Sequence, residues 1–236
     1  MKNNPSYLTK IQADWDITNL LHLQLLLRYA YTDVKEVTRP DKNPVFSTPN
    51  RSFLAGMIRF GAVDYYLERG CAMGLLNGIT PVWRDLKEPD ANDEAKGATP
   101  RGQGVRALEL LGKHTSLISH HLQVPEDPPR GSKLRDDMRV RNEQNPLLPA
   151  FADNQTPVIA PIHLTLVHGN KSAEFAFLRV YDNFQHANNF LPVGENIMQI
   201  TPLSTAGTGG AEEIAEAEIK LKKHLKEFRQ QQQGEM

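Results

Sequence analysis

The chain has 236 residues with a formal net charge of −1, and 39% of its residues are hydrophobic. This length and apolar content suit one sizeable domain, or two small ones, with a buried core. The near-neutral charge excludes a global electrostatic attraction to nucleic acid or to an acidic membrane. The single cysteine, Cys71, excludes an intrachain disulfide bond and a cysteine-rich zinc site.

The N-terminal residues 1–16 are polar and lack the apolar segment of a secretory signal peptide. We expect them to form a flexible lead-in. Apolar runs elsewhere are far shorter than the roughly 20 residues that cross a bilayer as a helix. The sequence therefore predicts a cytoplasmic protein with no membrane contact.

Residues 17–37 fit two structures. The leucines at alternate positions from 21 to 27 are typical of a strand, which would pass into a helix near Arg28. The high helix propensity of leucine favours instead one buried helix over the whole segment. Both interpretations remain open at this point.

Residues 39–51 contain three prolines and predict a loop. Ser52 is a suitable N-cap for the helix that follows. The apolar residues near one face of this helix are Phe53, Met57, Phe60, Leu67, Cys71 and Leu75. Its four glycines, Gly56, Gly61, Gly70 and Gly74, indicate close packing against another backbone more readily than a ligand site.

The middle of the chain alternates between polar loops and one predicted helix. Residues 87–104 are polar with proline and glycine, and residues 124–149 are charged and interrupted by prolines, so both are expected to be loops. Residues 104–122 between them predict a helix. Its apolar stripe consists of Leu108, Leu111, Thr115, Ile118 and Leu122.

Residues 157–192 predict a strand, a turn and an amphipathic helix. Ile162, Leu164 and Leu166 alternate with His163 and Thr165, which would lie on the opposite, outward face of the strand. A turn at residues 169–170 then separates the strand from the helix. The helical stripe, at steps of four and three, consists of Ala173, Phe177, Val180, Phe184, Ala187 and Leu191.

Residues 204–236 predict a flexible glycine-rich linker followed by a charged helix. Glutamates come early in this helix and lysines late, which matches the helix dipole at both ends. Its narrow apolar seam consists of Ile214, Ala217, Leu221, Leu225 and Phe228. The remaining residues, 17–203, would form one domain that folds without this helix.

The predicted fold is α+β and mainly helical, with a small antiparallel β-ribbon packed on helices in a ribbon-helix-helix-like arrangement and a separate C-terminal helix. The two strand–helix segments would supply the ribbon. Both place a histidine after the first apolar residue of the strand and a polar residue two positions later, at His22 and Gln24 and at His163 and Thr165.

Catalytic signatures are absent from the sequence. It contains no GxxxxGK[ST], HExxH or GxSxG motif. His114 and His121 are seven residues apart, whereas two metal ligands on one helix are usually four apart. We therefore expect no enzymatic activity, no metal ion, no cofactor and no small-molecule substrate.

A two-stranded ribbon can lie in the DNA major groove, where its outward side chains contact base edges. The residues predicted to do so are His22, Gln24, His163 and Thr165. Arg28 and Lys171, near the starts of the following helices, could reach phosphates. The alternative is ordinary, because polar residues on the solvent face of a half-buried strand show the same pattern.

Three segments together resemble a known family. They are LHLQLLLRYAYTDVKEV, FLAGMIRFGAVDYYLERG and PVIAPIHLTLVHGNKSAEFAFLRVYDNF. In this order and spacing the chain is similar to the AcaB-like proteins of conjugative plasmids and integrative conjugative elements. The resemblance implies a dimeric regulator with a ribbon-helix-helix fold, which binds double-stranded DNA and controls the transcription of conjugation genes.

Two functions are therefore expected from the sequence. The first is a homodimeric DNA-binding transcriptional regulator of a mobile element. The alternative is a non-enzymatic scaffold or protein-interaction component of a conjugative element, which the near-neutral net charge favours.

Overall fold

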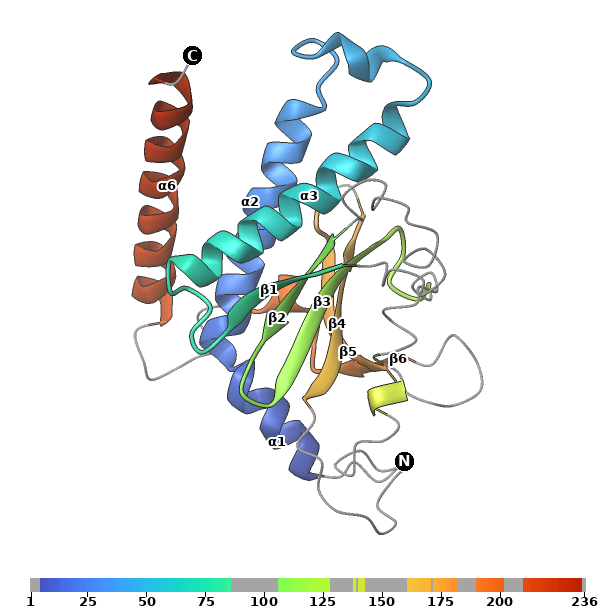
Figure 1. Cartoon of the computed structure of the whole chain (residues 1–236), viewed down its shortest axis with the longest axis vertical. Coiled ribbons are helices and arrows are strands. Elements are labelled where there is room, and N and C mark those ends of the chain that lie inside the picture. Colours follow the sequence, from blue (N-terminus) through green and yellow to red (C-terminus); the bar gives the residue numbers. More distant parts are fainter. Residues whose placement is uncertain are drawn as a thin grey trace, which may run out of the picture. The chain divides into compact units, whose positions relative to one another are not determined.

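A computed structural model (Figure 1) describes residues 5–85, 106–127, 138, 140–142, 161–170, 172–181, 190–201 and 210–234. The chain divides into two compact units. Unit 1 comprises residues 1–14, 78–169 and 177–194, and unit 2 comprises residues 15–77, 170–176 and 195–236. The chain therefore passes between the two units several times. The sequence predicts instead a single domain over residues 17–203.

The sheet has six strands in the order β1-β2-β3-β4-β5-β6. The strands are β1 (Thr80–Asp85), β2 (Arg106–Leu111), β3 (Thr115–Leu122), β4 (Ile162–Gly169), β5 (Phe175–Tyr181) and β6 (Phe190–Val193). Strand β2 is antiparallel to both β1 and β3, β3 and β4 are parallel, and β5 and β6 are antiparallel. The fold is α+β, but the predicted two-stranded ribbon is wrong, because the strands form a larger, mixed sheet.

Strand β4 confirms the strand expected around residue 164, but not its outward face. All eight of its residues are buried, including His163 and Thr165. A strand that is buried on both faces is typical of the middle of a sheet with a parallel neighbour. The prediction that His163 and Thr165 face outward is therefore wrong.

The segment after β4 is a second strand, not the predicted amphipathic helix. Asn170 and Ala173 adopt positive φ angles of 67° and 51°, which turn the chain back toward β4. Strand β5 then follows, rich in the aromatic and β-branched residues that strands favour. Residues 182–189, which include Phe184 and Ala187 of the predicted stripe, lie outside the described residues.

The predicted helix over residues 104–122 is instead the β2–β3 hairpin, and its turn is held by the N-terminal helix α1 (Pro5–Asp14). The Asp14 carboxylate accepts hydrogen bonds from the His114 backbone N–H at 2.7 Å and from the Thr115 hydroxyl at 2.8 Å. A Cβ at Gly112 would lie 2.4 Å from Asp14 Oδ2, so glycine is required there. Residues 5–14 are thus part of the folded unit, not a flexible lead-in, and Ile11 is buried.

In unit 2, residues 17–37 form a single helix, α2 (Ile17–Val37), so the strand interpretation is wrong and the helix interpretation is confirmed. The Asp16 side chain caps its start by accepting a hydrogen bond from the Asn19 backbone N–H at 2.8 Å. Residues 21–27 are all buried. A helix buried on all sides carries no single apolar stripe, which explains why its leucines also fit an alternating pattern.

Helix α3 (Arg51–Ala72) confirms the helix predicted from the apolar stripe, although Asn50 and not Ser52 is at its N-cap. It follows the short 3-10 helix η1 (Pro44–Ser47) and crosses α2 (Figure 1). At the crossing, a Cβ added to Gly70 would lie 2.4 Å from Leu26 Cδ1. Gly70 therefore provides the close backbone approach that the glycines of this segment predicted.

The C-terminal helix α6 (Gly210–Gly234) packs on α2. Ala217 and Leu221 are buried, and the Tyr29 hydroxyl donates a hydrogen bond to Glu218 Oε1 at 3.1 Å. The prediction of a separate C-terminal helix is therefore wrong, because Ala217 and Leu221 of its apolar seam are buried in unit 2. None of the helices in the described ranges is long and apolar enough to cross a membrane.

Removing the buried side chain of α6 should destabilise the protein. We expect Leu221→Ala to lower the free energy of unfolding by about 2–5 kcal/mol, because a fully buried leucine is lost and a cavity remains. The matched control is Lys226→Ala, an exposed position on the same helix, which should change stability by less than about 0.5 kcal/mol. Urea unfolding curves measure both; equal small effects would contradict the packing of α6.

The glycines of α3 should respond oppositely to substitution by alanine. Gly70→Ala should lower the free energy of unfolding by about 1–3 kcal/mol, because the new methyl group overlaps the buried Leu26 side chain. Gly61→Ala should raise it by roughly 0.5–1 kcal/mol, because nothing lies within 4 Å of the new Cβ and alanine has the higher helix propensity. Thermal unfolding of both variants tests the crossing; a stable Gly70→Ala protein would argue against it.

Candidate functional site

The two residues of α2 that the sequence assigned to base edges are buried and hydrogen-bonded inside unit 2. His22 Nδ1 lies 2.6 Å from the Leu75 carbonyl oxygen. Gln24 Nε2 donates to the carbonyl oxygens of Ile197 at 2.8 Å and Ile200 at 3.0 Å. The prediction that His22 and Gln24 point outward is therefore wrong: both bind the backbone of connecting segments.

The other residues assigned to DNA are dispersed. His163 and Thr165 share one buried face of β4, with exposed fractions of 1% and 0%. Arg28 is exposed, but it lies in the middle of α2 and not at the start of a helix. Lys171 lies outside the described residues. No common ribbon holds these residues, since α2 is a helix, and their binding to DNA stays a prediction.

Polar side chains connect four successive strands on one face of the sheet, and we refer to Arg84, Glu109, Ser116 and His163 as the polar ladder. Arg84 Nε of β1 donates to Glu109 Oε2 of β2 at 2.6 Å. Ser116 Oγ of β3 donates to the other carboxylate oxygen of Glu109, and His163 Nδ1 of β4 lies 3.1 Å from Ser116 Oγ. Glu109 and Ser116 were not predicted from the sequence, because the spacing of the leucines around them favoured a helix over residues 104–122.

The ladder does not have the arrangement of a serine–histidine catalytic pair. The Ser116 hydroxyl donates its proton to Glu109, so it must accept the proton of His163 Nδ1. The imidazole thus presents an N–H to the serine, whereas a general base presents a lone pair. Ser116 and Glu109 are also buried. The ladder holds β1 to β4 together and offers no accessible nucleophile.

Burial keeps His163 neutral. The pKa of His163 is lowered to about 4, mainly because burial desolvates the ring; Glu109 opposes this shift, and Arg141 and Arg84 add to it. The backbone of His163 is also fixed, because Asn142 Nδ2 donates to its carbonyl oxygen at 2.9 Å and Asn142 Oδ1 accepts from its N–H at 2.8 Å. At the β4 end of the polar ladder, the His163 side chain is therefore uncharged and its backbone is held in place.

Other reactive groups offer little chemistry. In the described ranges, no group of three or more His, Cys, Asp or Glu residues is placed to hold a metal ion. Burial and the nearby Glu68 raise the pKa of the Cys71 thiol to about 12, so it is not a thiolate near neutral pH. The features left to consider are therefore surfaces that could bind another molecule.

The N-terminal half of α3 exposes a row of large apolar side chains, which we name the α3 face: Phe53, Met57 and Phe60. Their exposed fractions are 68%, 60% and 39%. Steps of four and three residues place them on one side of the helix. Val37 and Val45, at the same end of the helical hairpin formed by α2, η1 and α3, are also half exposed. Exposed apolar side chains that share one side of a helix are a common feature of protein-binding surfaces.

The α3 face lies on the same side of α3 as Leu67, which is buried in the half of the helix that packs on α2. In the C-terminal half of the helix, Val63, Leu67 and Gly70 are buried at the crossing with α2. The sequence predicted this stripe from Phe53 to Leu75 as one apolar side of the helix. It could not show that α2 covers only its second half.

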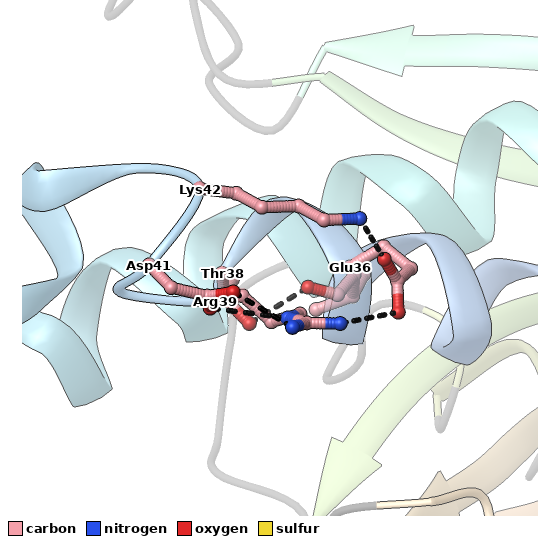
Figure 2. Close-up of polar contacts among 6 residues, drawn as sticks. Glu36, Thr38, Arg39, Asp41 and Lys42 are labelled. Atoms are coloured by element: carbon pink, nitrogen blue, oxygen red, sulfur yellow. Dashed lines mark hydrogen bonds and ion pairs between the residues drawn. The ribbon is translucent and has the colours of Figure 1, made fainter.

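The same end of the hairpin carries positive charge. Residues 35–62 include five cations and two anions, a net charge of +3 in a chain whose net charge is −1. Both anions are paired at the end of α2 (Figure 2): Arg39 Nη2 lies 2.7 Å from Asp41 and Arg39 Nη1 lies 3.6 Å from Glu36, which also binds Lys42. Arg51, in the first turn of α3, makes no ion pair within the described residues.

The chain matches no protein-family model, no curated protein and no solved structure. The similarity to AcaB-like proteins therefore stays a prediction from the sequence.

The buried His163 should make the protein less stable in acid. Its pKa is about 6.5 in an unfolded chain and about 4 in the folded protein, so the unfolded state takes up the proton first as the pH falls. We expect the free energy of unfolding to fall by up to roughly 3 kcal/mol between pH 6.5 and pH 4 from this residue alone.

The control variant for this prediction is His163→Asn, whose side-chain amide can still donate to Ser116 but does not titrate. Urea unfolding at several pH values should show a shallower pH dependence over this range for the variant than for the parent protein. Identical slopes would mean that His163 does not contribute to acid lability.

Proposed function

We propose that this chain is a non-enzymatic interaction protein that binds a partner protein through the α3 face. The observation that carries the proposal is that one continuous apolar side of α3 is buried in its second half and exposed in its first. Phe53 and Met57 are each at least 60% exposed, which costs free energy unless another surface covers them. An apolar row at helical spacing is the usual anchor of helix-mediated recognition.

Features of the polar residues also favour protein binding over direct base contacts. The four side chains assigned to base edges, His22, Gln24, His163 and Thr165, are all buried. Base contacts need side chains that reach into a groove. The resemblance to AcaB-like proteins would set an interaction protein of this kind in a conjugative element, where it would work beside the transfer machinery or its regulators.

Photo-crosslinking from the α3 face tests this proposal. With benzoylphenylalanine at position 53, we expect an ultraviolet-dependent adduct with one discrete protein in cells that naturally contain the chain. The same probe at Val124, an exposed apolar residue of unit 1, is the matched control and should give no such adduct. Met57→Ser together with Phe60→Ser should reduce the adduct. Absence of any adduct at position 53, or equal adducts at both positions, would contradict the proposal.

A further inference from the structure

The apolar side of α3 follows a seven-residue repeat that runs through both halves of the helix. Two rows of residues make up this repeat, a row of large side chains and, three residues further on, a row of smaller ones. The two rows are Phe53, Phe60 and Leu67, and Gly56, Val63 and Gly70. Alternating steps of three and four residues form the seam against which a second helix packs. We name these six residues the α3 seam.

Helix α2 covers the second half of the α3 seam. Val63 and Leu67 are buried there, in the part of α3 that packs on α2. At Gly70 a Cβ would lie 2.4 Å from Leu26 Cδ1, so the Leu26 side chain occupies space that a larger residue at position 70 would need. A glycine of the seam is therefore a recess for a leucine of the neighbouring helix.

The first half of the α3 seam repeats this pattern in the open. Helices α2 and α3 diverge from their crossing toward the segment that joins them (Figure 1). Phe53 and Phe60 are exposed, and no atom of the described residues lies within 4 Å of a Cβ added to Gly56. Gly56 precedes Gly70 by two repeats, so the two glycines lie on nearly the same side of the helix. A second recess is therefore open between two exposed phenylalanines.

We propose that the partner bound by the α3 face is an α-helix of another protein, which packs along the first half of the α3 seam and places a leucine-sized aliphatic side chain over Gly56. This inference rests on the proposed function and states what kind of element the partner presents. The exposed half of the seam continues the half that already holds a helix, and it has the same order of large side chains and recesses. An extended segment advances about 3.3 Å per residue, so its side chains do not match this helical spacing.

Filling the recess should displace the partner and leave the fold intact. With benzoylphenylalanine at position 53, Gly56→Leu should lower the yield of the ultraviolet-dependent adduct about tenfold or more, because the new side chain takes the place of the partner's. The matched control is Gly61→Leu, where the added Cβ also has no atom of the described residues within 4 Å, but which lies outside the seam. Its adduct should persist. Thermal unfolding should show both variants at least as stable as the parent, since leucine has the higher helix propensity.

The positions of the adducts on the partner identify its secondary structure. Benzoylphenylalanine at position 53 and, in a separate variant, at position 60 places the two probes about 10.5 Å apart along α3. Mass spectrometry should find the two crosslinked residues of a helical partner about seven positions apart in its sequence. On a strand, the same distance corresponds to about three positions.

Four results would overturn the helical partner. These are crosslinked residues about three positions apart, an adduct that Gly56→Leu leaves unchanged, an adduct that both leucine variants reduce equally, and an adduct with a second copy of the chain. The first three leave the proposed function intact, because position 53 still crosslinks to a discrete protein. If position 53 of the otherwise unchanged chain crosslinks to nothing, the proposed function itself fails, and this inference fails with it.

Discussion

Unit 2 depends on a set of hydrogen bonds between the side chains of α2 and the backbone of the segments around it. Asn19 exchanges two hydrogen bonds with the Asn77 backbone, at 2.8 and 3.0 Å, and His22 lies within hydrogen-bond distance of the Leu75 carbonyl. Gln24 holds the 3-10 helix η3 (Ile197–Gln199) through two carbonyl oxygens. Each bond contributes about 1 kcal/mol, but an unpaired amide at the same position would cost about 1–3 kcal/mol. The leucines of α2 could therefore pack on many surfaces, whereas these three polar side chains accept one arrangement.

This arrangement sets the position of the uncovered surface. Asn19 and His22, in the first turns of α2, fix the end of α3 and the residues just after it, so the two helices are in close contact where Gly70 meets Leu26. Toward the other end of α3, Phe53 and Met57 lie beyond this contact. The residues of the α3 face are as apolar as those that α2 covers. Their exposure therefore results from the position at which α3 is held against α2.

The sequence predicted local elements well where one structure alone fits the pattern. Helix α3 and the helical part of α6 follow the spacing of their apolar residues, and β4 follows its alternation. The prediction failed where the same apolar residues fit both a helix and a pair of strands. Leu108, Leu111, Thr115, Ile118 and Leu122 fit a helical stripe, yet the turn at Gly112 forms because Asp14, about a hundred residues away, accepts hydrogen bonds from it. A pattern limited to neighbouring residues contains no information about such a partner.

The candidate site shows the same limit for side chains. A polar residue in an apolar stretch has two explanations: it faces water, or it is buried and pairs with another polar group. The predicted ribbon depends on the first explanation for His22, Gln24, His163 and Thr165. In the structure the first three pair with backbone or with the polar ladder.

An apolar residue in a helical stripe also has two explanations: it is buried in the core, or it is exposed on the surface. The spacing predicts one apolar side of α3 from Phe53 to Leu75, but hydrophobic spacing alone does not say whether a partner element covers it. Phe53 and Met57 are apolar like the buried Leu67, and they differ from it in being at least 60% exposed. We therefore expect the binding surface of this chain where apolar side chains remain exposed. An exposed apolar side chain is stronger evidence for such a surface than a polar side chain that already has a hydrogen-bond partner inside the fold.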